Sequence, residues 1–507
     1  MILLNFLISI TLSTNEIEQN DRLLLVISLD GFRYDYLDFY AEKNGFLNSL
    51  AKRGVRACWS ESIYPTQTYP NHWSIATGLY PETHGIINND VYDPKIKKYF
   101  KYDKDQEDEP GWFENYEPIW ITNHKSDLKR KNTVVIDWPG GVAKFDLNKE
   151  QEKGHTVRHP SSKFFNITTF NDTVDLFVQS LSNEKTNLAF LYFGEPDVSG
   201  HIYGPESQQV ETVVRQIDLV LEYLFEQMKL KKKFILKDHK LDINDGDTSE
   251  YRYIDLVILT DHGMSNIQNH YDITNKQLNA NRKFDSNRHL FLSDYIQVSK
   301  YIDVDKSSSG SLSELWLITD DAKLIDELYE QLVKLKAISN GKLDMVYLKN
   351  DIPERFYLKS NYRTAPIILT AIEGFQIFVT REKQKKQYFG NHGYDNEFKS
   401  MRGIFLAHGH SFKNSFFSKK PIKIIDTYLL LCYILGLQPN PNNGSFSRVK
   451  HIIEENLLVK INANKKFDFE NDLEEDDLMK LFFYGGVLFL IGLIFISVLV
   501  PFLAIFT

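Results

Sequence analysis

Candidate metal ligands lie directly beside strongly apolar segments of the sequence. Asp30 ends the run LLLVISLD, Asp197 ends NLAFLYFGEPD, and Asp261 lies near the end of IDLVILTDHG. His262 follows Asp261 directly, and His201 comes four residues after Asp197. Carboxylate oxygens and imidazole nitrogens are the ligands that zinc accepts when no thiolate is offered. The pairs therefore predict a metal site, although each pair alone is also typical of ordinary hydrogen-bonded residues.

A threonine in the stretch YPTQTYPNH, residues 64–72, is the candidate nucleophile. Proline is tolerated in the first turn of a helix, so Pro70 predicts a helix that begins near Tyr69 with Thr68 as its N-cap. Free amides and the helix dipole favour negative charge there, and a metal-bound hydroxyl can lose its proton near neutral pH and attack phosphorus. Thr66 lies outside this position and is interpreted as structural. The alternative for Thr68 is a helix cap without chemistry.

The elements that must position these residues are predicted strands and helices of an α/β fold. Residues 23–30, 187–197 and 254–263 contain continuous hydrophobic runs, as in parallel strands covered on both faces. Residues 210–230 have apolar positions at helical spacing. We therefore expect a doubly wound, mostly parallel sheet with helices on both faces. In such sheets ligands bind beyond the carboxyl ends of the strands, so the three aspartates are expected to converge.

Composition limits the classes of function. The 507 residues can bury a large core, and a formal net charge of −9 without a basic stripe argues against binding to a nucleic-acid polymer. A small anionic substrate is still compatible, because a metal ion supplies local positive charge. Two cysteines, Cys58 and Cys432, are too few for a disulfide scaffold. They can pair with each other or remain thiols.

The two ends of the chain are apolar and differ in kind. Residues 1–14 are interpreted as a signal peptide, with a buried first strand as the alternative. Residues 21–465 form the expected catalytic domain, residues 466–480 an acidic stalk, and residues 481–503 an apolar segment long enough to cross a bilayer. Exchange of that segment for a lipid anchor is the alternative.

Three glycosylation sequons, at Asn166, Asn171 and Asn443, agree with an extracellular body. We therefore expect a single-pass cell-surface protein whose catalytic domain is extracellular.

The motifs together resemble the ectonucleotide pyrophosphatase/phosphodiesterase family, within the alkaline phosphatase-like superfamily. Nearly the whole body takes part, with the motifs in the family's order: SLDGFRYDYL, PTQTYPNHWSIATGLYPETHGIINN, EPIW, WPGG, EPDVSGHIYGP, TDHGM, NHGYDN and NPNNGS. The resemblance implies two zinc ions, with Thr68 as the nucleophile. The positions that match the ligands of one ion are Asp30, Thr68, Asp261 and His262, and those that match the other are Asp197, His201 and His392.

The resemblance also indicates how substrate is held. Asn89, in GIINND, matches an asparagine that donates a hydrogen bond to a phosphate oxygen. Tyr69 matches an aromatic residue that packs against the base in nucleotide-cleaving relatives, and Trp138 lies where those relatives also line the pocket. The alternative for Trp138 is an ordinary core residue. Aromatic faces suit nucleotide bases and choline cations alike, and the residues after WPG, Gly141 and Val142, depart from the nucleotide-cleaving pattern.

The resemblance to the short, membrane-anchored members implies an ectoenzyme that hydrolyses nucleotides or dinucleotides to nucleoside monophosphates. One alternative is a choline phosphodiesterase that acts on lysophospholipid or glycerophosphocholine. Another is a non-catalytic cell-surface module, against which the filled ligand positions argue.

Overall fold

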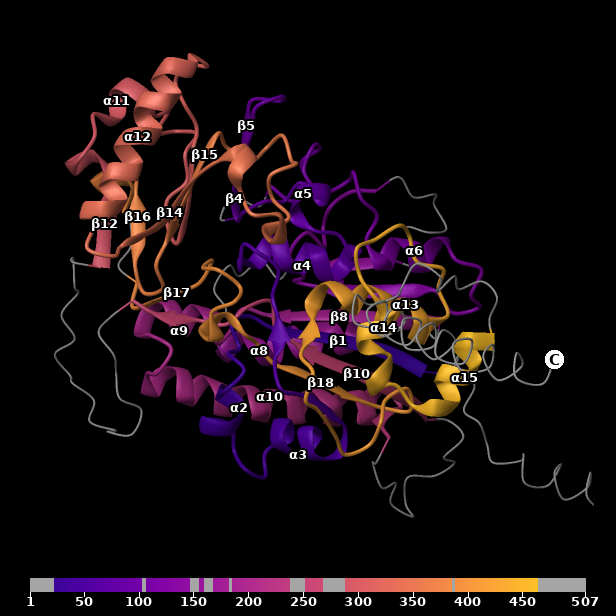
Figure 1. Cartoon of the computed structure of the whole chain (residues 1–507). Helices are drawn as coiled ribbons and strands as arrows, with labels where there is room; N and C mark the ends of the chain where they lie inside the picture. Colours follow the sequence, from indigo (N-terminus) through magenta and orange to yellow (C-terminus); the bar gives the residue numbers. More distant parts are fainter. Residues whose placement is uncertain are drawn as a thin grey trace, which may run out of the picture.

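The computed structural model describes residues 22–102, 106–145, 155–158, 167–181, 185–237, 251–267, 288–384 and 388–463 (Figure 1). The expected signal peptide, acidic stalk and apolar C-terminal segment lie outside these residues, as does the sequon at Asn166. Across the described ranges, every helix is too short or too polar to cross a membrane. Cys58 and Cys432 are both free thiols.

A mixed, mostly parallel sheet forms the centre of the molecule, with the strand order β19-β2-β18-β10-β1-β8-β6-β7 and with β9 also paired to β10. The parallel strands are β1 (Arg22–Leu29), β6 (Asn132–Ile136), β7 (His155–Arg158), β8 (Thr186–Phe193), β9 (Phe234–Leu236) and β10 (Arg252–Leu259). Strand β18 (Phe405–His408) is antiparallel to β10 and to β2 (Val55–Ala57), and β19 (Phe416–Ser418) is parallel to β2.

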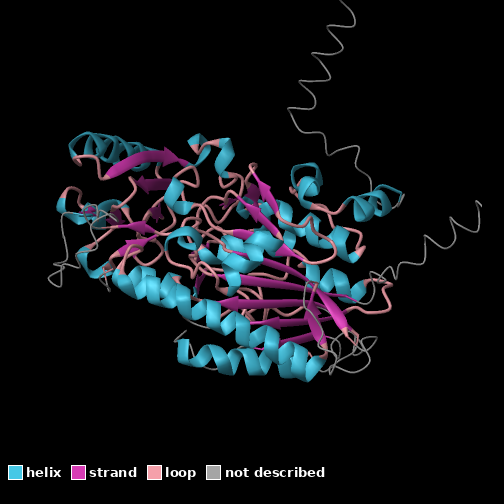
Figure 2. Ribbon diagram, turned by 90° about the horizontal axis from the view of Figure 1, so that it is seen from below, coloured by secondary structure: helices cyan, strands magenta, loops and turns pink. Residues whose placement is uncertain are grey.

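Helices cover both faces of this sheet, which explains why its central strands are apolar throughout (Figure 2). Leu23, Leu25 and Ile27 of β1 belong to a core that includes α3 (Phe46–Arg53), α8 (Ile167–Ser180) and α10 (Gln208–Lys232). Leu24 and Val26 face the opposite core, with α4 (Thr68–Thr77), α6 (Ile119–Lys125) and α13 (Thr427–Leu435). The predicted α/β fold with a mostly parallel sheet is confirmed, and the predicted helix over residues 210–230 lies within α10.

A second group of elements, within residues 288–384, forms a lobe with its own core at the upper left of Figure 1. Its antiparallel sheet has the order β13 (Leu312–Leu315), β15 (Ile367–Ala371) and β14 (Leu343–Leu348), covered by α12 (Ala322–Ile338). The same core contains α11 (Val298–Tyr301) and the parallel pair of β12 (His289–Phe291) and β16 (Gln376–Phe378). The sequence pattern did not predict this division.

Shorter elements complete the described fold. They are α2 (Tyr36–Phe39), α5 (Pro81–His84), α9 (Asp197–Tyr203), α14 (Phe446–Val449), α15 (Glu455–Ala463) and three small strand pairs: β3 (Ser60–Glu61) with β20 (Ile422–Lys423), β4 (Asp90–Asp93) with β5 (Lys98–Lys101), and β11 (Ser265–Asn266) with β17 (Gly390–Asn391).

The carboxyl ends of β1, β8 and β10 meet as expected, with one difference. Asp30 follows β1 directly, and Asp261 comes two residues after β10. Asp197 does not end β8. That strand stops at Phe193, and Asp197 is the first residue of α9, where its amide donates to the Asp30 carbonyl at 3.0 Å. The three aspartates therefore still share one edge of the sheet.

Candidate active site

Helix α4 brings Thr68 to this edge of the sheet. The N-cap is Gln67, which is extended, so Thr68 is the first helical residue rather than the predicted N-cap. The reason is that Pro70 has no amide hydrogen, and the first amide able to bond back is that of Asn71, which donates to the Gln67 carbonyl at 3.2 Å. Thr66 is buried, and its hydroxyl donates to the Tyr394 carbonyl at 2.9 Å.

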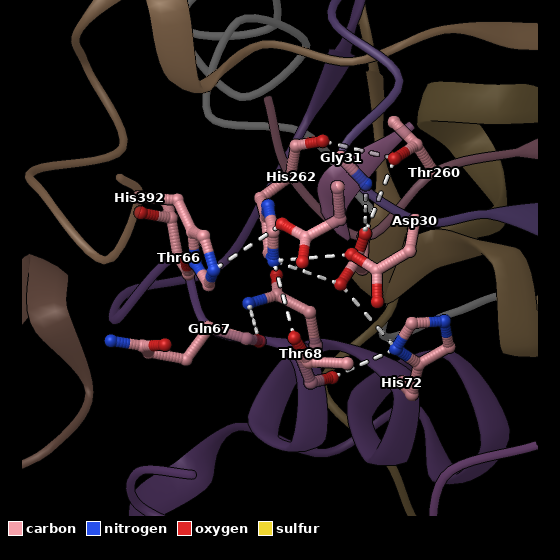
Figure 3. A network of polar contacts seen from close by, with 12 residues as sticks. Asp30, Gly31, Thr66, Gln67, Thr68, His72, Thr260, His262 and His392 are labelled. Carbon is pink, nitrogen blue, oxygen red and sulfur yellow. Dashed lines mark hydrogen bonds and ion pairs between the residues drawn. The ribbon is translucent and has the colours of Figure 1, made fainter. Parts of the chain in front are cut away.

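The first group of candidate ligands surrounds the Thr68 hydroxyl. His262 Nε2 lies 3.4 Å from Thr68 Oγ1, 3.0 Å from Asp261 Oδ2 and 3.5 Å from Asp30 Oδ1. Figure 3 shows the side chains of Thr68, His262 and Asp30 turned toward one another. The ligand atoms of Asp30, Asp261 and His262 lie close enough together to hold one metal ion.

The second group lies on the other side of His262. His392 Nε2 is 3.5 Å from Asp197 Oδ1 and 3.0 Å from His201 Nε2, and His201 Nε2 is 3.5 Å from Asp197 Oδ2. The rings of His262 and His392 stack with centroids 3.7 Å apart, so the two groups adjoin (Figure 3). Asp197, His262 and His392 can together hold an ion, which makes His262 common to both arrangements of ligand atoms.

Backbone carbonyls fix the orientation of the three histidines. His201 Nδ1 faces the Gly390 carbonyl, His262 Nδ1 faces that of Gly263, and His392 Nδ1 faces that of Thr66, each at 2.9 Å. Because a carbonyl only accepts, each Nδ1 carries the hydrogen, and each Nε2 presents its lone pair to the centre of the site. This is the usual arrangement of metal-binding histidines.

The carboxylates show that a cation fits this site. Asp30 Oδ1, Asp197 Oδ1 and Asp261 Oδ2 are buried and accept no hydrogen bond from the described residues. Burial raises the pKa of Asp30, and the charges of Asp261 and Asp197 raise it further. Burial also raises the pKa of Asp197. Asp30 and Asp197 are therefore poorly stable as anions on their own, and divalent cations between the carboxylates would supply the missing charge.

Residues that sequence reasoning missed support these ligands. His72 Nδ1 donates to the Thr68 carbonyl at 2.8 Å, and its Nε2 accepts from the Ser28 hydroxyl at 2.8 Å. The Tyr192 hydroxyl donates to Asp30 Oδ2. His72 carries a usable signal, because it is four residues after Thr68 and so shares a helix face with it. Tyr192 gives no such signal, since it is one aromatic residue within an apolar strand.

Asn89 lies at the start of α4, as predicted, but its side-chain amide already forms hydrogen bonds within the protein. Its Oδ1 accepts the Tyr69 amide at 2.9 Å, and its Nδ2 donates to Gln67 Oε1 at 3.1 Å. Since Pro70 has no amide hydrogen, Thr68 supplies the one first-turn amide that has no acceptor among the described residues. Of the free amides expected at this helix start, the described residues therefore leave that of Thr68.

The two predicted aromatic residues differ in exposure. Trp138 is fully buried, and its ring packs edge-on against His72 and Phe190 at centroid distances of 4.9 and 4.8 Å. It therefore does not line a pocket, and the alternative of a core residue is correct: it fills space beneath the site. Tyr69 is mostly buried, with its hydroxyl donating to Glu107 Oε1 at 2.5 Å.

The remaining sequons lie on the surface. Asn171 is exposed on α8, and Asn443 is exposed with its Oδ1 accepting the Tyr80 amide at 3.3 Å.

Comparison with known proteins identifies the family. The sequence profile of the type I phosphodiesterase / nucleotide pyrophosphatase family matches residues 24–395. The chain belongs to this family. Its fold is accordingly of the alkaline phosphatase-like α/β type, and the chain is a phosphodiesterase of the nucleotide pyrophosphatase class.

Individual relatives agree. The human bis(5'-adenosyl)-triphosphatase ENPP4 is 32% identical over 439 residues, which cover 86% of this chain and 83% of that protein. Human ectonucleotide pyrophosphatase/phosphodiesterase family member 5 is 31% identical over 456 residues, covering 89% and 83%. The structure of an inactive threonine-to-alanine variant of murine ENPP5 in complex with AMP matches with a TM-score of 0.69 at 29% identity, over 85% of this chain and 100% of that one.

Proposed function

We propose that this protein is a zinc-dependent extracellular phosphodiesterase that hydrolyses nucleotides or dinucleotides to nucleoside monophosphates through a covalent threonine intermediate. The observation that carries the proposal is the convergence of two Asp/His groups beside the Thr68 hydroxyl. Relatives that are named for dinucleotide hydrolysis, or that bind AMP, support the substrate class.

The donor set indicates which residues would hold the two ions. Asp30, Asp261 and His262, with Thr68, would hold one, and Asp197, His201 and His392 the other. Carboxylate oxygens and imidazole Nε2 atoms without thiolates suit zinc. When bound, two such ions polarise the phosphoryl group and stabilise the attacking and leaving oxygens of an in-line displacement.

Thr68 would act as the nucleophile. Its Oγ1 attacks phosphorus, the bond to the leaving oxygen breaks, and the nucleotidyl group becomes esterified to Thr68 until water releases it as the monophosphate. His72 holds the Thr68 carbonyl and so fixes the first turn of α4. The inactive threonine-to-alanine variant of murine ENPP5 supports this role by showing that a related enzyme depends on one threonine.

Asn89 and the Thr68 amide would hold a non-bridging phosphate oxygen. The Asn89 Nδ2 group donates to Gln67 Oε1 at 3.1 Å without substrate. We expect it to exchange this partner for the phosphate oxygen, whose negative charge makes it the stronger acceptor. Tyr69 would lie beside the base of the retained nucleotide.

The cellular setting is also part of the proposal. The apolar segment over residues 481–503, the acidic stalk and the exposed sequons support an extracellular domain, residues 21–465, attached to the cell surface. Relatives whose names describe them as ectonucleotide enzymes support the same setting.

Replacement of the nucleophile tests the mechanism. In Thr68→Ala, hydrolysis of the nitrophenyl ester of thymidine monophosphate should fall by at least about 10³-fold, because loss of the nucleophile in another covalent hydrolase costs even more. The matched control is Thr212→Ala on the exposed face of α10, which should retain full turnover. Retention of activity in Thr68→Ala would remove the proposed nucleophile.

A second assay separates the candidate substrates. Nitrophenyl phosphorylcholine should be hydrolysed more slowly than the thymidine ester, and faster hydrolysis would instead assign the choline phosphodiesterase activity. Chelation should abolish turnover of either ester, and Zn²⁺ should restore it more effectively than Mg²⁺ because the ligand set contains three histidines. Full activity in the chelated protein would contradict the metal requirement.

A further inference from the structure

Tyr388 lies directly beside the second group of candidate ligands. Its ring centroid is 4.7 Å from that of His201, with the planes inclined at 42°. The chain that follows is tied to α9, because the Phe389 amide donates to the His201 carbonyl at 2.8 Å and the Gly390 carbonyl accepts from His201 Nδ1 at 2.9 Å. The Tyr388 ring is therefore held at a fixed place beside the site.

A second tyrosine continues this aromatic surface outward. Tyr388 is half-buried, and Tyr102, which follows β5, is exposed. Burial and the charge of Asp197 raise the pKa of Tyr388, while a hydrogen bond with the Tyr102 side chain lowers it. Tyr388 thus lies between His201 and a hydrogen-bonded tyrosine that is more exposed.

The position of this surface relative to the nucleophile decides what it can bind. Thr68 Oγ1 lies at the first group, 3.4 Å from His262 Nε2. In an in-line displacement the leaving oxygen departs on the side of phosphorus opposite the nucleophile, and two-metal sites stabilise these two oxygens separately. The leaving group therefore faces Asp197, His201 and His392, where Tyr388 lies.

We propose that Tyr388, assisted by Tyr102, binds the leaving half of a dinucleotide by stacking against its base. This inference rests on the proposed function and adds a specificity determinant to it: the retained nucleotide lies near Tyr69, and the departing nucleoside lies on Tyr388. Aromatic side chains suit this task because every base offers a π-face, and a flat ring loses little conformational freedom on binding.

A pair of substrates that differ only in the second nucleoside tests this proposal. Diadenosine triphosphate and ATP both yield AMP, but the leaving half is ADP in one case and pyrophosphate in the other. Tyr388→Ala should lower kcat/KM for diadenosine triphosphate by about 5- to 150-fold, the usual cost of losing one base–aromatic stack. It should change kcat/KM for ATP by less than about 2-fold, because pyrophosphate offers no base to stack.

Binding provides a readout that does not depend on turnover. In a Thr68→Ala background, titration calorimetry should show the same selective loss of affinity for diadenosine triphosphate when Tyr388→Ala is added. Tyr388→Phe keeps the ring and should restore most of the affinity, and Tyr295→Ala, at an exposed tyrosine of the lobe, is the matched control.

The outcomes separate this inference from the function on which it depends. Equal losses for both ligands, or no loss for either, would overturn the role of Tyr388 while leaving the phosphodiesterase intact. Loss of zinc in Tyr388→Ala would show that the ring merely supports His201, which also overturns it. If the unsubstituted protein cleaved neither nucleotide, the proposed function itself would fail.

Discussion

Two buried clusters of charge in this molecule are built in opposite ways. At the interface between the lobe and the body, Arg363 and Asp93 are both buried, and Arg363 Nε donates to Asp93 Oδ2 at 2.7 Å. Nη1 donates to the Gly85 carbonyl and Nη2 to the Gly111 carbonyl. Asp93 also accepts from the Tyr362 hydroxyl and from two backbone amides. Burial opposes ionisation of Asp93, but the hydrogen bonds from Tyr362 and Arg363 lower its pKa.

The candidate metal site is equally buried, but its polar atoms are not all hydrogen-bonded within the described residues. Its three carboxylates lie at one edge of the sheet, and each has an oxygen that accepts no hydrogen bond from the described residues. Within the described residues, these carboxylates form ion pairs only with histidines. A buried ion pair whose polar atoms are all hydrogen-bonded within the protein supports the fold. A buried cluster of carboxylates with unpaired oxygens needs a bound cation to be stable. The difference separates a structural contact from a functional one.

Removing one carboxylate from the incomplete cluster should break function but not the fold. Asp30→Asn keeps an acceptor for the Tyr192 hydroxyl, yet it should lower turnover by more than about 10²-fold, the upper end of the cost of losing a residue that only orients a metal ligand. In the presence of chelator, the thermal midpoint of Asp30→Asn should equal or exceed that of the unsubstituted protein. The reason is that the variant lacks the repulsion between the carboxylate of Asp30 and those of Asp261 and Asp197. Phosphodiesterase assays and thermal melts with and without Zn²⁺ measure both effects.

Asp38→Asn is the matched control, since Asp38 forms an exposed ion pair with Arg56. It should change neither turnover nor the effect of zinc on the melt. A large drop in the chelated midpoint of Asp30→Asn would mean that this carboxylate stabilises the fold, and the contrast between the two clusters would disappear.

Removing one partner of the Arg363–Asp93 pair should lower stability but leave the metal site intact. Arg363→Met leaves Asp93 buried without its cation, so the free energy of unfolding should fall by about 3–5 kcal/mol, while zinc affinity of the folded protein is retained. Denaturant titration measures the loss. Adding Asp93→Asn should recover part of it, because the stranded charge is then gone. Arg381→Met, at an exposed pair with Asp294, should cost no more than about 1 kcal/mol.

The contrast also shows how far sequence alone could lead. Asp30 and Asp261 were predictable because β1 and β10 are continuous apolar runs, and the residues after such strands share one edge of a parallel sheet. Helix α10 was predictable from its spacing, although the N-cap of α4 was misplaced by one residue. Asp197 was predicted in the right place for the wrong reason, since it begins a helix instead of ending a strand.

Long-range contacts explain what the sequence could not supply. The resemblance to the family suggests that Trp138 lines the pocket, but in the structure its ring packs against His72 and Phe190. No local sequence pattern predicts these contacts. The stacking of His262 on His392 joins segments far apart in the chain, and only the family resemblance had grouped them. The lobe was missed because the amphipathic helix α12 gives no sign of whether it covers the main sheet or a second one.

Glu314 shows a third way in which this protein buries an acidic side chain. This buried residue of β13 has no cation in contact among the described residues, and its Oε2 accepts from Asn88 Nδ2 at 3.0 Å, while Asn88 Oδ1 accepts the Asn89 amide at 2.8 Å. Burial raises the pKa of Glu314 to about 8, against the opposing effect of the Asn88 hydrogen bond. The side chain avoids the cost of an unpaired charge by keeping its proton.

The pH dependence of stability follows from that raised pKa. Between the ordinary glutamate pKa and about 8, the folded protein holds a proton that the unfolded chain has lost, so this contribution to stability is complete at low pH and disappears as the pH rises toward 8. Glu314→Gln stays neutral at every pH and still accepts from Asn88. Its free energy of unfolding relative to the unsubstituted protein should therefore increase by at least about 1 kcal/mol between pH 5 and pH 8. Denaturant titrations at the two pH values measure this, and a constant difference would show that Glu314 is ionised throughout, which would place it with the metal-site carboxylates instead.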